Sequence, residues 1–201
     1  MINIVIAEDQ KLLRGALTSL LQLEDDIKIL AQLSDGKEAM EAIETLAPDL
    51  CILDIEIPIM TGLDVAEKIK EKDLPCKVMI VTTFARPGYL QKAMNIGVDS
   101  YLLKDEPIDF LVDSIRKVIH GQRVISAELA TALFISEENP LTEREKDVLR
   151  LAAEDKTTAQ IANTIYLTKG TVRNYLSTAI QKMEVESRHQ AIKKAKEKGW
   201  I

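Results

Sequence analysis

Short apolar runs alternate with amphipathic segments over the first 120 residues of the chain. The runs occupy residues 2–7, 27–31, 50–53, 78–81 and 101–103. Each run is nearly unbroken, which is typical of a strand buried on both faces. The amphipathic segments, with apolar residues at three- and four-residue spacing, occupy residues 11–23, 36–46, 63–72, 87–96 and 107–120. Strict alternation of five strands and five helices predicts an α/β fold, with a doubly wound parallel sheet covered on both faces.

The pattern changes after residue 122. Residues 123–139 form a connector with one amphipathic candidate helix, Ala127–Ile135, for which Ser126 is the expected N-cap. From Pro140 onward there is no strand signal, and three or four short helices are expected, the first beginning in the capping box Thr142–Glu145. We therefore expect an α/β domain over residues 1–122, a linker over 123–139 and a small all-α domain over 140–201.

Charge divides the chain at the same place. Residues 140–201 contain 12 lysines and arginines against 8 acids, whereas residues 1–139 contain 14 against 24. A basic region joined to an acidic one favours nucleic-acid binding by the second part alone. A solvated basic face remains the commoner explanation for such a small excess.

Several classes of protein are excluded by composition. The apolar runs are too short to span a membrane, and residues 1–9 lack the basic and apolar regions of a signal peptide. Cys51 and Cys76 lie in or beside apolar segments without nearby histidines, which favours buried free thiols over a disulfide or a metal site. We therefore expect a cytoplasmic protein with no membrane partner.

Polar side chains follow four of the predicted strands. Glu8 and Asp9 follow the first strand and Asp54 the third, while Thr82 and Lys104 follow the fourth and fifth. Because the carboxyl ends of parallel strands share one edge of the sheet, these groups are expected to meet there. Each could be ordinary by itself, as a helix cap or a strand-end residue, but their conjunction favours a functional site.

The chemistry of these groups suits phosphoryl transfer. Formation of an acyl phosphate needs a nucleophilic carboxylate, a divalent cation and a cationic group for the phosphoryl oxygens. Asp54 directly ends a buried strand and is the candidate nucleophile. Glu8 and Asp9 provide the few carboxylates that Mg²⁺ prefers, and Lys104 and Thr82 offer an ammonium and a hydroxyl.

Residues 1–122 resemble the receiver domain of two-component response regulators. The resemblance rests on Glu8-Asp9, Asp54 with Pro58 and Gly62, Thr82, and Tyr101-Leu102-Leu103-Lys104. It implies that Asp54 is the phosphoacceptor, that Glu8, Asp9, Asp54 and the main chain of Glu56 bind Mg²⁺, that Thr82 and Lys104 bind the phosphoryl group, and that Tyr101 is a switch residue. The chain departs from the usual pattern at Glu8, where aspartate is frequent. It also departs at Thr83, which is bulkier than the small residue often found at that position.

Residues 141–192 are similar to the LuxR-type helix-turn-helix. The similarity rests on Leu141-Thr142, Arg144-Glu145, Val148-Leu149, Ile161-Ala162, Leu167-Thr168, Thr171-Val172, Lys182, Val185, Arg188 and Ala191. It makes residues 169–183, an amphipathic segment that would otherwise be an ordinary surface helix, a recognition helix for the major groove. The chain departs from the pattern at Asp155, where glycine is common, and at Tyr175, where histidine is common.

The whole chain thus resembles a NarL/FixJ-type response regulator, a transcription factor and not an enzyme. The resemblance implies a sensor histidine kinase and promoter DNA as partners, and a homodimer on phosphorylation. By family position, Arg173, Asn174 and Ser177 face base edges, and Lys169, Thr171 and Lys182 meet phosphates. Two alternatives stay open: a phosphatase using Asp54-Ile55-Glu56, and a DNA-binding protein whose receiver serves only for dimerisation.

Overall fold

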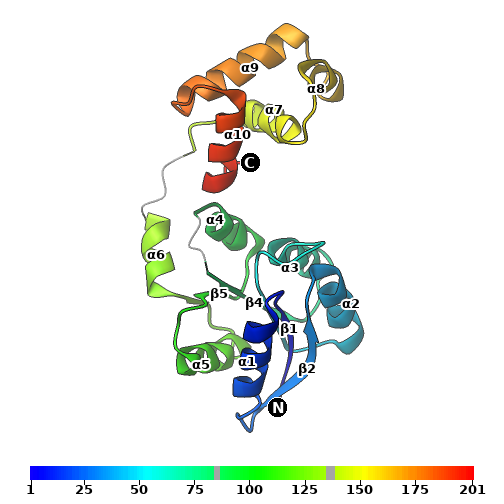
Figure 1. Ribbon diagram of the computed structural model, residues 1–201, viewed down its shortest axis with the longest axis vertical. Coiled ribbons are helices and arrows are strands. Elements are labelled where there is room, and N and C mark those ends of the chain that lie inside the picture. The colour runs from blue at the N-terminus through cyan, green and yellow to red at the C-terminus, as the bar shows by residue number, and fades with distance from the viewer. Residues whose placement is uncertain (84–86, 135–138) are drawn as a thin grey trace. The chain divides into compact units, whose positions relative to one another are not determined.

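The computed structural model describes residues 1–83, 87–134 and 139–201. For residues 87 and 131–134 it describes the backbone alone. It forms two compact units, an α/β unit that extends to Phe134 and a helical unit over the carboxyl-terminal region. Figure 1 shows the α/β unit from blue to green and the helical unit from yellow to red.

The α/β unit is built on a parallel sheet in the order β2-β1-β3-β4-β5-β6. Its strands are β1 (Ile2–Ala7), β2 (Ile27–Leu33), β3 (Leu50–Leu53), β4 (Lys77–Thr82), β5 (Ser100–Leu103) and β6 (Val124–Ile125). Its helices are α1 (Lys11–Leu21), α2 (Gly36–Leu46), α3 (Gly62–Glu71), α4 (Pro87–Ile96), α5 (Ile108–Ile119) and α6 (Ala127–Phe134). The predicted doubly wound parallel sheet is confirmed, with α1 and α5 on one face and α2, α3 and α4 on the other (Figure 1).

A sixth strand, β6, adds to the five predicted strands. Val124 and Ile125 pair in parallel with Ser100 and Tyr101 of β5. Two residues are too few to give an alternating or apolar pattern, so the pairing is set by the neighbouring edge and not by local sequence. Ser126, predicted as a helix N-cap, is fully buried. Its hydroxyl oxygen accepts a hydrogen bond from the backbone amide of Leu103 at 3.2 Å. The following helix begins at Ala127 as predicted, while Ile135 lies outside the described residues.

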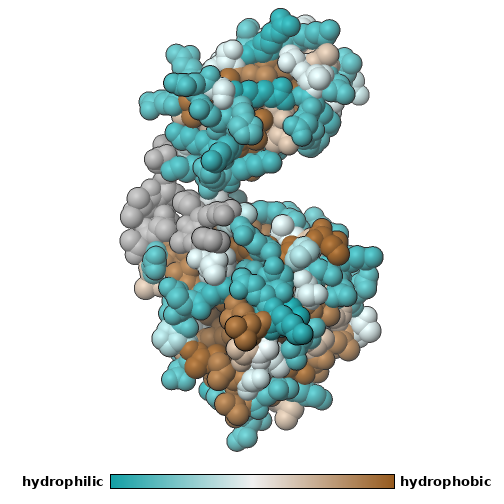
Figure 2. Space-filling view, viewed as in Figure 1, coloured by the Kyte–Doolittle hydropathy of each residue, from teal (hydrophilic) through white to brown (hydrophobic). Residues whose placement is uncertain are grey.

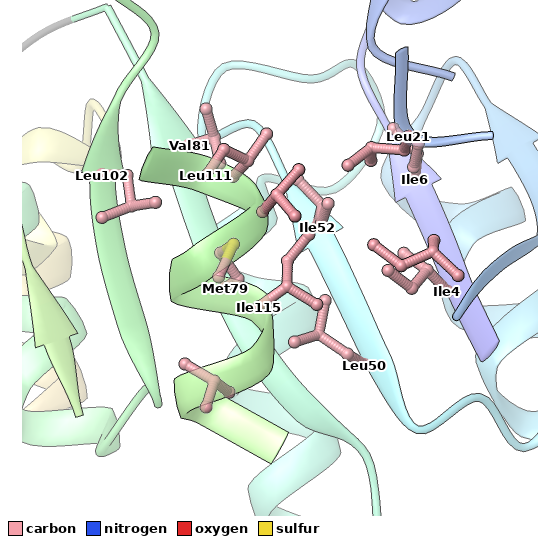
Figure 3. Packing of buried hydrophobic residues seen from close by; sticks show 13 residues of the cluster. Ile4, Ile6, Leu21, Leu50, Ile52, Met79, Val81, Leu102, Leu111 and Ile115 are labelled. Carbon is pink, nitrogen blue, oxygen red and sulfur yellow. The ribbon is translucent and has the colours of Figure 1, made fainter. Parts of the chain in front are cut away.

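The core under α1 and α5 is aliphatic. Leu111 and Ile115 of α5 pack over Ile52 of β3 and Met79 of β4, with Ile4 of β1 alongside (Figure 3). All are nearly inaccessible to solvent, and each such side chain contributes about 1.5–3 kcal/mol to folding. This packing fixes the strands relative to one another and therefore fixes the positions of the groups that follow them.

The two cysteines are free and buried, as the sequence predicted. Their sulfur atoms share one acceptor, the carbonyl oxygen of Lys77, at 3.5 Å from Cys51 and 3.4 Å from Cys76. Burial raises the pKa of the Cys51 thiol, which keeps it in its unreactive protonated form.

The helical unit contains α7 (Glu143–Ala153), α8 (Thr158–Thr164), α9 (Lys169–Lys182) and α10 (Arg188–Lys198). The predicted capping box at Thr142 is present, and Thr157 forms a second one before α8. Val148, Val172 and Ala191 come from three helices and are fully buried in one core. On the face seen in Figure 2 this unit is mostly hydrophilic, whereas more hydrophobic residues reach the visible face of the α/β unit.

Candidate functional site

An acidic pocket lies at the carboxyl ends of the central strands. The residues predicted from separate parts of the sequence meet there because β1, β3, β4 and β5 end at the same edge of the sheet. The pocket is lined by Asp9, Gln10, Asp54, Glu56, Thr82, Thr83 and Lys104. Glu8 contacts one of these lining residues, Lys104, through its carboxylate.

Lys104 is the centre of the pocket's charge arrangement. Its Nζ atom lies 2.8 Å from Oε2 of Glu8 and 3.1 Å from Oδ2 of Asp54. The three side chains are only 7%, 3% and 7% exposed, in the order Lys104, Glu8 and Asp54. At such burial each charge depends on its partners, because the surroundings solvate an isolated ion poorly.

The pKa values reflect this balance between burial and pairing. Burial raises the pKa of Glu8 above its usual range, although the hydrogen bond from Lys104 acts in the opposite direction. Burial also acts to lower the pKa of Lys104, but the hydrogen bond to Glu8 and the charge of Asp54 outweigh it, so the pKa of Lys104 is raised. The ammonium is therefore held in its charged form by the two acids.

Three carboxylates converge closely enough to share one cation. Glu8, Asp9 and Asp54 each place a carboxylate oxygen within 4.8 Å of the other two. Hard oxygen ligands of this kind, few in number and partly open to solvent through Asp9, suit Mg²⁺, which keeps several of its waters. The donor set fits the cation that the sequence predicted.

The loop after Asp54 is held by close backbone contacts. Oδ1 of Asp54 accepts the amide of Ile55 at 2.8 Å, and the amide of Gly62 donates to the carbonyl of Ile55 at 3.0 Å. A Cβ atom at Gly62 would lie 2.1 Å from the carbonyl oxygen of Asp54. Glycine at position 62 thus permits the loop to fold back against the candidate nucleophile.

Two predicted residues differ in their exposure. The side chain of Glu56 is exposed, and the residue contributes to the lining of the pocket. Tyr101, the predicted switch residue, is fully buried and therefore lies inward in the structure. Sequence reasoning missed Arg14, whose guanidinium donates to the carbonyl of Glu8. Arg14 lies on α1, whereas Glu8 precedes that helix, so no helical periodicity in the sequence indicated this contact.

The helical unit presents a polar face on α9. Lys169, Arg173, Asn174 and Ser177 are exposed, while Val172, Leu176 and Ala179 on the opposite face are buried. Thr168 caps the helix by accepting the amide of Thr171 at 3.1 Å, and the two threonine hydroxyls lie 2.8 Å apart. The predicted recognition segment is therefore a helix with the expected solvent face, and Met183 is its C-cap.

Lys182 has a partner that the sequence did not indicate. Its Nζ lies 2.8 Å from Oε2 of Glu145, a side chain only 4% exposed, which also accepts the amide of Thr142 in the capping box. Burial acts to raise the pKa of Glu145, but the hydrogen bonds from Lys182 and Thr142 prevail and lower it. This pair links the start of α7 to the end of α9, so the geometry favours a structural role for Lys182.

Comparison with known proteins identifies both units. The response regulator receiver domain matches residues 4–116, and the luxR family of bacterial regulatory proteins matches residues 139–195. The chain is a two-component response regulator of the LuxR family. Response regulators of this family are DNA-binding transcription regulators and not enzymes, which removes the phosphatase alternative.

Relatives of this response regulator match along the entire chain. The transcriptional regulatory proteins YvfU and DesR, both from Bacillus subtilis, are 53% and 50% identical to it over 201 residues, covering all of each chain. Among solved structures, a LuxR-family DNA-binding response regulator from Staphylococcus aureus is 49% identical over 59% of this chain and 99% of its own, with a TM-score of 0.58. RcsB from Salmonella typhimurium, at 18% identity and a TM-score of 0.69, shares the fold.

The regulator carries no candidate membrane span within its described ranges. None of the helices there combines the length and apolar composition needed to cross a bilayer.

Proposed function

We propose that this response regulator is switched by transfer of a phosphoryl group from a histidine kinase to Asp54. In this step a carboxylate oxygen of Asp54 attacks phosphorus, the phosphorus–nitrogen bond of the donor breaks, and the imidazole leaves. The observation that carries the proposal is the position of Lys104, with its ammonium on Asp54 and Glu8 in a pocket also lined by Thr82.

Mg²⁺ fits this proposal through Glu8, Asp9, Asp54 and the main chain of Glu56. When bound, the cation would neutralise charge on the phosphoryl oxygens. Lys104 can move from its acid partners to those oxygens, because a phosphoryl group offers it acceptors of higher charge. Thr82 supplies a hydroxyl donor from the neighbouring strand end.

A labelling experiment tests the phosphoacceptor. With Mg²⁺ and a small phosphodonor such as acetyl phosphate, the wild-type protein is expected to gain one acid-labile phosphoryl group by intact mass. Asp54→Asn keeps the shape of the side chain but removes the nucleophilic charge, so it is expected to gain none. Asp25→Asn, at an exposed acid outside the pocket, is the matched control. Equal labelling of Asp54→Asn, or labelling that survives acid, would contradict the assignment.

We further propose that phosphorylation favours a homodimer. The new phosphate adds nearly two negative charges beside Thr82 and Lys104 and biases an existing equilibrium, including the population of the inward position of Tyr101. Light scattering over a range of concentrations, with and without a stable phosphoryl mimic, is expected to show a larger mass with the mimic. The same mass in both states would rule out dimerisation as the output.

The DNA-binding role is proposed for the exposed face of α9. We propose that Arg173, Asn174 and Ser177 read base edges in promoter DNA and that Lys169 and Thr171 meet phosphates. Lys182 is better supported as the structural partner of Glu145 than as the phosphate contact that the family position implied.

We propose that the regulator acts in the cytoplasm, because it would meet both its kinase and the chromosome there.

A further inference from the structure

Tyr166 is an unusual residue in the turn between α8 and α9. Its side chain is 94% exposed, and it is the only exposed large apolar side chain among residues 139–201. The other six exposed side chains of this kind in the described chain lie in the α/β unit. Its neighbours Ile165 and Leu167 pack against the core of the helical unit, so the turn is anchored while the phenol ring gains nothing from packing.

The backbone of Tyr166 is also unfavourable. Its φ is 54°, in the left-handed region where the Cβ atom of a bulky residue crowds the following carbonyl group. Glycine or asparagine would adopt this conformation at lower cost. Tyrosine at this position therefore combines backbone strain with exposure of an aromatic ring, and no contact within the described unit offsets either.

A partner outside the chain accounts for both features. Tyr166 lies two residues before Thr168, the N-cap of α9, and three before the exposed Lys169. Unsatisfied amides and the helix dipole make this end of α9 attractive to anions, and tyrosine hydroxyls are among the donors that contact DNA phosphates. We infer that Tyr166 contacts the DNA backbone, donating its phenol hydroxyl to a phosphate at the edge of the groove that α9 enters.

This inference rests on the proposed DNA-binding role of α9 and adds a contact that carries no charge. Neutralising a phosphate with lysine releases a counterion, so loss of a lysine changes the dependence of affinity on salt. A neutral hydroxyl releases none. The contact of Tyr166 is therefore expected to contribute to affinity equally at all salt concentrations and for all sequences.

The test uses the full-length protein and a fluorescent duplex of random sequence, with affinity measured over a range of salt concentrations. Tyr166→Phe removes the hydroxyl alone and is expected to weaken binding about three- to tenfold, with an unchanged salt slope. Lys169→Ala is the charged comparison and is expected to reduce the salt slope by about one unit. Wild-type affinity in Tyr166→Phe would overturn the phosphate contact.

A second variant separates this contact from a structural role. Tyr166→Asn is expected to raise the melting temperature, because asparagine tolerates the left-handed conformation, and to weaken DNA binding at least as much as Tyr166→Phe. Ile59→Asn is the matched control: Ile59 is 76% exposed with a φ of 68° in the α/β unit, and its replacement is expected to stabilise without changing DNA affinity. A lower melting temperature in Tyr166→Asn would assign Tyr166 to folding and overturn the inference.

The outcomes also distinguish this inference from the proposed function. If the wild-type protein fails to bind duplex DNA in a salt-dependent manner, the DNA-binding role of α9 itself is wrong. If the wild-type protein binds and Tyr166→Phe binds equally well, only the proposed hydroxyl contact of Tyr166 is wrong. Loss of binding in Tyr166→Asn with retention in Tyr166→Phe would indicate a contact through the ring, and would also overturn the hydrogen bond.

Discussion

The two candidate sites place their charges in opposite surroundings. In the receiver pocket the side chains of Lys104, Glu8 and Asp54 are at most 7% exposed, and Nζ of Lys104 lies within 3.1 Å of a carboxylate oxygen of each acid. On α9, Lys169 and Arg173 are exposed along one helix face. Buried charges in contact share one energy balance, so changing one alters the state of the others, whereas exposed charges act nearly independently. The first arrangement suits a switch and the second suits the reading of a long polyanion.

The largest effect is expected when the buried ammonium is removed. Lys104→Met leaves Glu8 and Asp54 buried and facing each other, so the free energy of unfolding is expected to fall by about 3 kcal/mol. In this variant Mg²⁺ no longer competes with an ammonium group for the carboxylates. Its addition is therefore expected to raise the melting temperature more in Lys104→Met than in wild type. Thermal unfolding with and without Mg²⁺ measures both effects.

Lys117 provides the matched control for Lys104. It forms an exposed ion pair with Asp113 on α5, with a side chain that is 44% exposed. Lys117→Met is expected to change stability by less than about 1 kcal/mol, with the Mg²⁺ response of wild type. A small effect in both variants would show that burial does not couple the charges of the pocket.

Among the exposed charges, Arg173 is expected to matter for sequence preference. An arginine that binds guanine in a bidentate manner contributes about 1–3 kcal/mol of discrimination, so Arg173→Ala is expected to bring the affinities for specific and scrambled DNA together. A dimer is expected to need half-sites about one helical turn apart, near 10–10.5 base pairs. Competition binding measures the ratio, with Arg144→Ala on α7 as the control. A wild-type ratio in Arg173→Ala would place recognition elsewhere.

The smallest effect concerns Glu145, where the DNA-binding unit has its own buried charge. Glu145→Gln keeps a residue suited to the capping box but removes the ion pair with Lys182, so stability is expected to fall by about 1 kcal/mol at neutral pH. Because the pKa of Glu145 is lowered by folding, this contribution is present above the unfolded pKa of about 4.3 and is lost as pH falls through the folded value.

The measurement is thermal unfolding of both proteins at several pH values. The stability difference between wild type and Glu145→Gln is expected to be constant near pH 7 and to shrink below about pH 4. Glu143→Gln is the control, since Glu143 is 79% exposed in its pair with Lys146. A difference that persisted at low pH would mean that hydrogen-bond geometry, and not charge, accounts for the role of Glu145.

The receiver pocket was predictable because strand order follows from chain order in a doubly wound sheet. Residues as distant as Glu8 and Lys104 come together once their strands are recognised, and apolar runs mark those strands clearly. Contacts that cross between elements without a repeating pattern were not predictable. The ion pair between Lys182 and Glu145 is one case, and the hydrogen bond from the Leu103 amide to the Ser126 hydroxyl is another. Each depends on the packing of complete elements.

Element boundaries show the same limit. The apolar pattern continued α1 to Leu23, but the helix ends at Leu21, and β2 extends to Leu33, beyond the predicted Ala31. Leu23 is 76% exposed in the loop that follows α1. Apolar spacing alone does not distinguish an apolar loop residue from the last turn of a helix. The length of β2 is set by its pairing with the neighbouring strand β1, which the local sequence does not show.

The two-residue strand β6 has a practical consequence for anyone who recombines such regulators. Val124 and Ile125 cover the outer edge of β5, and Ser126 adds its backbone amide to the carbonyl of Tyr101 at 3.1 Å. A receiver truncated at residue 122 would lose this cover and present an open strand edge, which invites pairing between molecules. A graft that exchanged the output domain at that point would give β5 a foreign neighbour beside Tyr101. Hybrid regulators made from this chain should therefore be joined after Ser126.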